Sequence, residues 1–366
     1  MRTSLVVILL FITLHLSISF AQEIPTIVYK HQTIVDDDYV FNNEGLNVPT
    51  ILRVNHATDE LVVIDIENDC IYFFTKEGEF LRKSGRYGEG PGEFLWLSYL
   101  AINPVGEIYI HDMRNQRISI LSKDGSFINS FRSGDFFETT LSINNNIISN
   151  IPTNGYFITV LNNKGKIEKH IGKYPRHKVI ENSNVLANFG QGWAFLDSDN
   201  CYYFFAMRTG IVYKFDGKGA LLYEKPLENI PYIKTIRNSG NYMKPKKMPS
   251  GKPTIPFHDM MYEVLFYNER FYLLIVNMFE KHGEGNDDYR AYIYELDKEF
   301  NINKRILLDI NNDDVQARGS GINQSAELYK AGMYIQMKVD YDFTDGSIYY
   351  PHRYNSKIYR FSAIKN

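Results

Sequence analysis

A recurring hydrophobic pattern divides the chain into short strands separated by polar turns. In each copy an aliphatic residue lies seven positions before a glycine, and an apolar residue follows two positions after it. The clearest copies are residues 70–78, 117–125 and 211–219. Apolar runs around a polar turn that ends in glycine predict a β-hairpin, because glycine adopts the positive φ that a tight turn needs. Residues 157–167 form a weaker copy, and in residues 291–299 we expect Glu299 to take the place of the turn glycine.

Further strands precede each hairpin and complete a repeated unit. The nearest ones are rich in aromatic and β-branched residues and span 61–65, 108–112, 202–206 and 271–277. Shorter apolar runs lie upstream again, such as residues 49–54 and 97–102. The turn positions 78, 125, 165, 219 and 299 are spaced by 47, 40, 54 and 80 residues. Four-stranded units at intervals of about 40–50 residues predict the blades of a β-propeller, an all-β fold.

A sixth hairpin ends the chain and lacks its returning strand. Residues 348–350 and 357–361 form it, and only five residues follow. An open edge would leave backbone groups unpaired, so another segment must fill it. Residues 26–35 are rich in β-forming residues and have no hairpin of their own. We therefore predict six four-stranded blades in a ring closed by this N-terminal strand, whereas seven blades would require the interval 219–299 to be split.

The first 21 residues have the pattern of a secretory signal peptide. Arg2 precedes an apolar run over residues 5–18, and Ser19 and Ala21 supply small residues before a cleavage site. The alternative is a membrane anchor, but the run is shorter than the ~20 residues needed to span a bilayer. Gln22 stands where a lipoprotein would need cysteine. We expect cleavage after Ala21, no transmembrane segment afterwards, and a single periplasmic or extracellular domain over residues 22–366.

Composition narrows the class of protein and its partners. The 366 residues are 44% hydrophobic, 23% charged and 14% aromatic, which excludes disordered and collagen-like chains. A net charge of −3 supplies no broad basic surface for nucleic acid or an anionic membrane. Cys70 and Cys201 are too few for a disulfide framework and lack zinc-site spacing. We expect each to be a small buried residue on a strand, with a disulfide between them as the alternative.

One stretch of the chain resembles a known family. Residues 85–94 read GRYGEGPGEF, and Asp112, Asn115 and Arg117-Ile118 follow the next predicted strand. This arrangement resembles secreted bacterial six-bladed β-propellers related to NHL-repeat proteins, strongly over residues 46–132 and weakly afterwards. The resemblance implies the fold, whereas fold alone does not assign an activity. The glycines also suggest a phosphate loop, but a dinucleotide-binding loop lies between a strand and a helix, and strands are predicted on both sides here.

Candidate ligand-binding residues lie in loops between the second and third strands of the blades. They are Arg114, Arg208, His352, Arg353 and Tyr354. Because these loops meet at one end of a propeller channel, the arginines could clamp a carboxylate, a sulfate or an acidic sugar with forked hydrogen bonds. The alternative is that Arg114 and Arg208 pair with acidic residues of neighbouring blades, namely Asp65, Glu67 or Asp112.

Histidines supply candidate metal ligands, although none has the spacing of a local metal motif. Propeller metal sites gather one ligand from each of several blades, so local spacing does not exclude a site. Imidazole and carboxylate groups are the usual ligands. The candidates are His111, His258 and His352, with Asp112 and Asp259 beside the first two.

Two insertions interrupt the repeat. Residues 234–257 are basic, proline-rich and expected to be poor in helix, whereas residues 279–289 are acidic. Loops of this length are often functional, so a protein or acidic-glycan contact is one interpretation and a solvated excursion the other.

The leading hypothesis for function is an exported, non-enzymatic binding module. Its loop face would recognise a protein, a peptide or a glycan in the cell envelope. The competing hypothesis is a metal-assisted hydrolase or lyase at the channel mouth, with a divalent metal as its cofactor. A third is a structural component of an envelope complex, which would show an exposed apolar patch and no pocket.

Overall fold

The computed structural model describes most of the chain after the predicted signal peptide. The described residues are 24–36, 40–41, 44–132, 138–141, 147–150, 155–162, 164–173, 190–239, 246–247, 253–254, 260–277, 290–309, 339–352 and 356–364. The predicted signal peptide, residues 1–21, and the acidic insertion, residues 279–289, lie outside them. Within the described residues, none of the helices has the length and apolar character needed to cross a bilayer.

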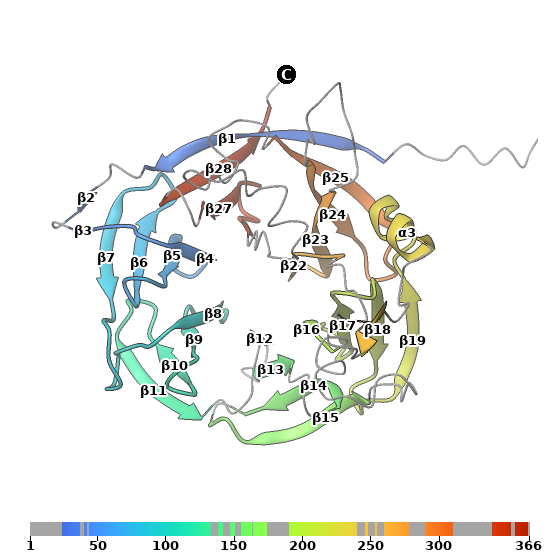
Figure 1. Cartoon of the computed structure of the whole chain (residues 1–366), viewed down its shortest axis with the longest axis horizontal. Coiled ribbons are helices and arrows are strands. Elements are labelled where there is room, and N and C mark those ends of the chain that lie inside the picture. Colours follow the sequence, from blue (N-terminus) through green and yellow to red (C-terminus); the bar gives the residue numbers. More distant parts are fainter. Residues whose placement is uncertain are drawn as a thin grey trace, which may run out of the picture.

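The strands form sheets arranged around a central axis, as in a β-propeller (Figure 1). Four sheets have four antiparallel strands each, with the first strand near the axis and the last at the rim. Sheet 1 contains β4 (Pro49–Asn55), β5 (Glu60–Asp65), β6 (Cys70–Thr75) and β7 (Phe80–Ser84). Sheet 2 contains β8 (Leu97–Ile102), β9 (Ile108–Asp112), β10 (Arg117–Leu121) and β11 (Phe127–Arg132).

Sheets 3 and 4 continue the ring in the same order. Sheet 3 contains β12 (Glu138–Leu141), β13 (Ile147–Asn150), β14 (Tyr156–Leu161) and β15 (Ile167–Lys173). Sheet 4 contains β16 (Gly192–Leu196), β17 (Tyr202–Ala206), β18 (Ile211–Phe215) and β19 (Leu221–Pro226). The all-β class predicted from the hydrophobic pattern is confirmed, because the strands lie where the apolar runs placed them.

The remaining main strands form one eight-stranded sheet. Its order is β22 (Glu263–Tyr267), β23 (Arg270–Asn277), β24 (Arg290–Leu296), β25 (Ile302–Asp309), β1 (Thr26–Val35), β28 (Lys357–Ala363), β27 (Ile348–His352) and β26 (Asp340–Tyr341). Strand β1 lies antiparallel to β28, from Tyr29 opposite Ala363 to Val35 opposite Ile358. Its first half also pairs in parallel with β25, a contact that the sequence analysis did not predict.

The hairpin turns between third and fourth strands share one hydrogen-bond pattern. A side-chain oxygen at the end of the third strand accepts a hydrogen bond from the backbone N–H four residues later, and the residues that supply it are Thr75, Ser122, Asn162, Asp216 and Asp297. The residue three positions later has positive φ, and these residues are Gly78, Gly125, Gly165, Gly219 and Phe300. Short polar side chains favour such turns because they bond to the backbone locally.

The fifth turn corrects one expectation from the sequence. The turn position is Phe300, with φ +63°, rather than Glu299. The N–H of Phe300 donates to the carbonyl of Asp297, as the turn glycines do in the other hairpins. Ile293 then lies seven residues before the turn, as the repeat requires. The sequence pattern was misleading because a buried aromatic residue replaces the glycine that marks the other turns.

Apolar side chains fill the seams between neighbouring sheets. The seam between sheet 4 and β22–β25 is dominated by large buried rings, which are Trp193, Tyr203, Phe205, Phe271 and Phe300. Helix α3 (Pro231–Asn238) packs Ile233 and Ile236 against this cluster. The sequence analysis expected little helix in residues 234–257, and α3 occupies the first of them, 234–238, where its periodic apolar residues bury one face.

The two cysteines are not joined in a disulfide. Cys70 is buried at the start of β6, as expected, whereas Cys201 is half-buried just before β17. The alternative of a disulfide between them is therefore wrong.

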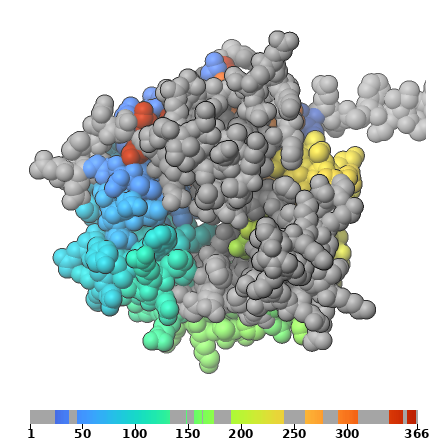
Figure 2. Space-filling view, in the orientation of Figure 1, coloured from blue at the N-terminus to red at the C-terminus, as the bar shows by residue number. Residues whose placement is uncertain are grey.

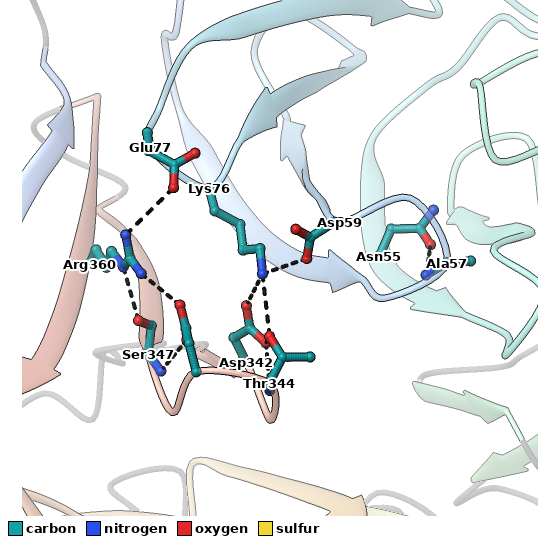
Figure 3. A network of polar contacts seen from close by, with 10 residues as sticks. Asn55, Ala57, Asp59, Lys76, Glu77, Asp342, Thr344, Ser347 and Arg360 are labelled. Carbon is teal, nitrogen blue, oxygen red and sulfur yellow. Dashed lines mark hydrogen bonds and ion pairs between the residues drawn. The ribbon is translucent and has the colours of Figure 1, made fainter.

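Sheet 1 is joined to β26–β28 by charged side chains (Figure 3). The ammonium group of Lys76 contacts the buried carboxylate of Asp342 at 2.8 Å and also contacts Asp59. Arg360 of β28 lies 3.9 Å from the carboxylate of Glu77. The Lys76–Asp342 contact joins residues that are 266 positions apart, so it connects sheet 1 to the last strands of the described chain.

Candidate functional site

The loop between β7 and β8, residues 85–96, carries the glycine-rich motif and is anchored by Asp112. This carboxylate accepts hydrogen bonds from the Leu95 N–H at 2.9 Å, the Asn115 amide at 2.8 Å and the Arg117 guanidinium at 3.0 Å. Burial raises the pKa of Asp112 above its ordinary value, although these hydrogen bonds oppose the rise. Asp112, Asn115 and Arg117 are the residues on which the resemblance rests, and together they hold this loop.

The guanidinium of Arg117 also holds the same loop. It donates to the carbonyl oxygens of Glu89, Gly90 and Glu93 at 2.9, 2.9 and 2.7 Å. The carboxylate of Glu93 accepts the Gly90 N–H at 2.8 Å and pairs with Arg86, and both contacts lower the pKa of Glu93. An N–H of the glycine loop therefore binds the protein's own carboxylate.

The rigid loop presents exposed aromatic side chains. Trp96 is 47% exposed and Tyr87 is 73% exposed. The guanidinium of Arg114 lies 5.0 Å from the centre of the Trp96 ring, within the range of a cation–π contact. Met113, which precedes Arg114, is also exposed, and its N–H donates to the Trp96 carbonyl. We call these four residues, Tyr87, Trp96, Met113 and Arg114, the loop-face patch.

Trp96 is held in an unusual backbone conformation. Its φ is +60°, a region that bulky residues rarely occupy. The Trp96 N–H donates to the carboxylate of Asp69 at 2.8 Å, and Asp69 itself has φ +44°. Two strained residues from adjacent sheets are therefore coupled by one hydrogen bond. Such strain persists only where the surrounding structure fixes it, and it concentrates at functional sites.

The predicted arginine clamp is only partly described. Arg114 is exposed on sheet 2 and stacks on Trp96, whereas Arg208 is buried in the β17–β18 loop of sheet 4. The side chain of His352, together with Arg353 and Tyr354, lies outside the described residues. The expectation that these side chains meet around one ligand stays a prediction.

Two of the three acids suggested as partners for those arginines, Asp112 and Asp65, have other contacts. Asp112 binds Arg117, as described above. Asp65 accepts the backbone N–H groups of Asn47 and Val48 at 2.6 and 3.1 Å. Both carboxylates serve to hold loops.

Of the candidate metal ligands, the structure describes His111 and Asp112, and the metal site stays a prediction. His111 is buried in β9, where its Nδ1 shares a 2.8 Å hydrogen bond with the Ser98 hydroxyl. Burial lowers the pKa of His111 to about 4, so the ring is neutral at pH 7. His258 and Asp259, and the side chain of His352, lie outside the described residues.

Elsewhere in the structure, three carboxylates surround the ammonium group of a lysine. Asp197, Asp199 and Glu269 converge where sheet 4 meets β22–β23. The ammonium group of Lys298 lies 3.1, 2.7 and 2.5 Å from them. Burial alone would lower the pKa of Lys298, but the hydrogen bonds to these acids raise it above its ordinary value. Lysine therefore takes the position that a metal ion would need.

A buried charged cluster near the axis was missed by the sequence analysis. Arg53 of β4 lies 3.4 Å from the carboxylate of Glu263 in β22, and Asp340 of β26 accepts the Val54 N–H at 2.6 Å. Burial raises the pKa of Asp340. The signal was Arg53 itself, a charge inside an apolar run, because buried charges are usually paired.

Comparisons with known proteins agree with this fold. Residues 43–173 match the model of a family described as "6-bladed beta-propeller", which confirms the predicted resemblance to six-bladed β-propellers. Among proteins of curated function, none matches the chain.

Two solved structures are similar to the chain as a whole. A solved streptogramin B lyase is 13% identical, with 92% of this chain and 98% of that chain covered and a TM-score of 0.50. A putative exported protein from Bacteroides fragilis is 12% identical, with 93% and 100% covered and a TM-score of 0.46. At such low identity the likeness to the lyase shows the β-propeller fold alone.

Proposed function

We propose that this chain is an exported six-bladed β-propeller that binds a protein partner through the loop-face patch. The composition of the patch carries this proposal. Tryptophan, tyrosine, methionine and arginine are enriched at the centres of protein interfaces, and truncation of tryptophan, tyrosine or arginine there often weakens binding most. Trp96 and Tyr87 are presented to solvent by a loop that Arg117 and Asp112 hold rigid, so little ordering is required on binding.

The six-blade count rests on how the eight-stranded sheet divides. Strands β22–β25 run antiparallel, as do β26–β28 with β1, and the two halves meet at the parallel pair β25–β1. Each half has the four strands of one blade. Together with sheets 1–4 they make six blades, in which β1 is the outer strand of the last blade and closes the ring. The description of the matching family supports this count.

Export rests on the signal-like pattern of residues 1–21. The first residue of the processed protein would be Gln22. Mass spectrometry of the protein isolated from the periplasm or medium tests this, and an unprocessed N-terminus would contradict it.

A photo-crosslinking experiment tests the partner hypothesis. Benzoylphenylalanine is placed at position 96 in residues 22–366, and at Val105 as a control, because Val105 is an exposed apolar residue in the β8–β9 turn of the same sheet. We expect one cell-envelope protein to be crosslinked from position 96 and not from position 105. The purified partner should then bind Trp96→Ala at least about 30-fold more weakly, a loss of roughly 2 kcal/mol. Equal crosslinking from both positions, or unchanged affinity of Trp96→Ala, would contradict the proposal.

A further inference from the structure

An open cavity of about 390 Å³ lies on the outer side of the seam between sheets 3 and 4. Its walls are β14 and β15 on one side and β18 and β19 on the other (Figure 1). The cavity is large enough for a small ligand, since such sites usually measure about 300–1,000 Å³. Sheet 3 lies at the lower rim of the space-filling view (Figure 2). We call this cavity the seam groove; it is separate from the loop-face patch, which belongs to sheet 2.

Aromatic rings form most of the groove. Phe157 and Tyr213, from opposite sides of the seam, stack with their centres 4.4 Å apart. Next to them the imidazole of His170 stacks on Tyr156, with centres 4.7 Å apart and planes 16° apart. A 3.1 Å hydrogen bond between Thr159 Oγ1 and His170 Nδ1 fixes that ring. His170 is exposed, Tyr156 is half-buried, and both residues line the groove, so a ligand there would contact this stacked pair.

The rim of the groove is polar and electrically balanced. Lys173 stands at the end of β15 and Glu224 on β19, and both are exposed. One positive and one negative group give no net charge that would select an anion or a cation. They do supply a hydrogen-bond donor and an acceptor beside apolar ring faces. A neutral ligand with both an apolar face and polar edges fits this arrangement.

We propose that the seam groove binds a short stretch of neutral carbohydrate. A pyranose ring presents C–H groups on its faces and hydroxyl groups along its edge. The faces would lie on the Tyr156–His170 pair, and the hydroxyl groups would bond to Lys173 and Glu224. This site does not depend on the proposed protein partner, because it lies on different sheets.

Isothermal titration of residues 22–366 with neutral oligosaccharides tests this inference. The probes are maltoheptaose, cellohexaose, xylohexaose and mannohexaose. We expect at least one to bind, and His170→Ala and Tyr156→Ala to weaken that binding at least tenfold. His170 is exposed, so its replacement leaves the packing of the seam in place and separates loss of binding from loss of folding.

Tyr87→Ala is the matched control, since it removes an exposed aromatic ring from the loop-face patch. It should leave oligosaccharide affinity unchanged. Failure of all four probes to bind would overturn the inference. So would binding that survives both groove substitutions, or binding that Tyr87→Ala abolishes. None of these results bears on crosslinking from position 96, so the two proposals fail independently.

Discussion

Arg117 shows how much of the candidate site depends on a single side chain. Its guanidinium joins the buried carboxylate of Asp112 to three carbonyl groups of the glycine-rich loop. Arg117 and Asp112 therefore act through backbone geometry, and the groups that would contact a partner are Trp96 and Tyr87. Tyr87 lies within the motif, but sequence reasoning assigned no role to either ring, because neither ring belongs to the hairpin repeat.

Replacing Arg117 by alanine should destabilise the protein substantially. The change leaves the Asp112 carboxylate buried without its charged partner and frees three carbonyl groups, so we expect a loss of roughly 3 kcal/mol. Urea unfolding measures the loss. Arg86→Ala is the control: its guanidinium is 79% exposed and pairs with Glu93, so its removal should cost less than about 1 kcal/mol. Equal losses in the two variants would contradict the anchoring role of Arg117.

His111 should make the protein less stable in mild acid. Burial lowers its pKa from 6.5 to about 4, so between these values the unfolded chain binds a proton that the folded protein does not. Stability should therefore fall as pH drops from about 6.5 towards 4, by at most about 1.4 kcal/mol per pH unit from this residue. Urea unfolding of the wild type and of His111→Gln at pH 7 and pH 5 tests this. The variant should lose roughly 2 kcal/mol less than the wild type over that interval; parallel slopes would refute the assignment.

At the scale of secondary structure, local signals explain why the hairpins were predictable. A polar residue at the end of one strand and a positive-φ residue three positions later are close in sequence, so they leave a readable pattern. Phe300 broke that pattern by one position because its side chain serves the seam as well as the turn. The partners of Arg53 and Lys298 were not predictable, because they are distant in sequence; Glu263, for example, lies 210 residues from Arg53. Their formation depends on the curvature of the whole ring.

Phe300 combines a buried aromatic ring with a positive φ. We therefore expect the order in which alanine and glycine are tolerated to be reversed at this position. Both Phe300→Ala and Phe300→Gly remove the buried ring and should cost roughly 3–5 kcal/mol. Glycine should nevertheless be the better tolerated by about 1 kcal/mol, because only alanine keeps the steric cost of a positive φ. Thermal or urea unfolding compares them. Phe205 lies on β17 and serves as the control, because there alanine should be better tolerated than glycine. If alanine and glycine rank in the same order at positions 300 and 205, the argument is wrong.

At the scale of the whole molecule, β1 holds two parts of the eight-stranded sheet together. Residues 26–30 pair with β25, and residues 29–35 pair with β28. A chain that starts at residue 31 would lose the first pairing and keep most of the second. A chain that starts at residue 37 would lose both and expose two strand edges, which invites aggregation.

These truncations should have graded effects on unfolding. We expect the chain from residue 31 to melt cooperatively but several degrees lower, and the chain from residue 37 to lose cooperative melting. A synthetic peptide of residues 24–36, added to the shorter chain, should restore the cooperative transition. A scrambled peptide is the control. Cooperative melting of the shorter chain without peptide would show that β1 is dispensable.

The double pairing of β1 also limits when the chain can finish folding during its synthesis. Residues 26–35 leave the ribosome more than 300 residues before one of their partners, residues 357–363. Pairing between such distant segments is slow and cannot occur in an unfinished chain. Any product of interrupted synthesis keeps unpaired strand edges and stays open to proteases. Pairing of β1 with β28 thus distinguishes chains that carry both segments from fragments that lack one of them.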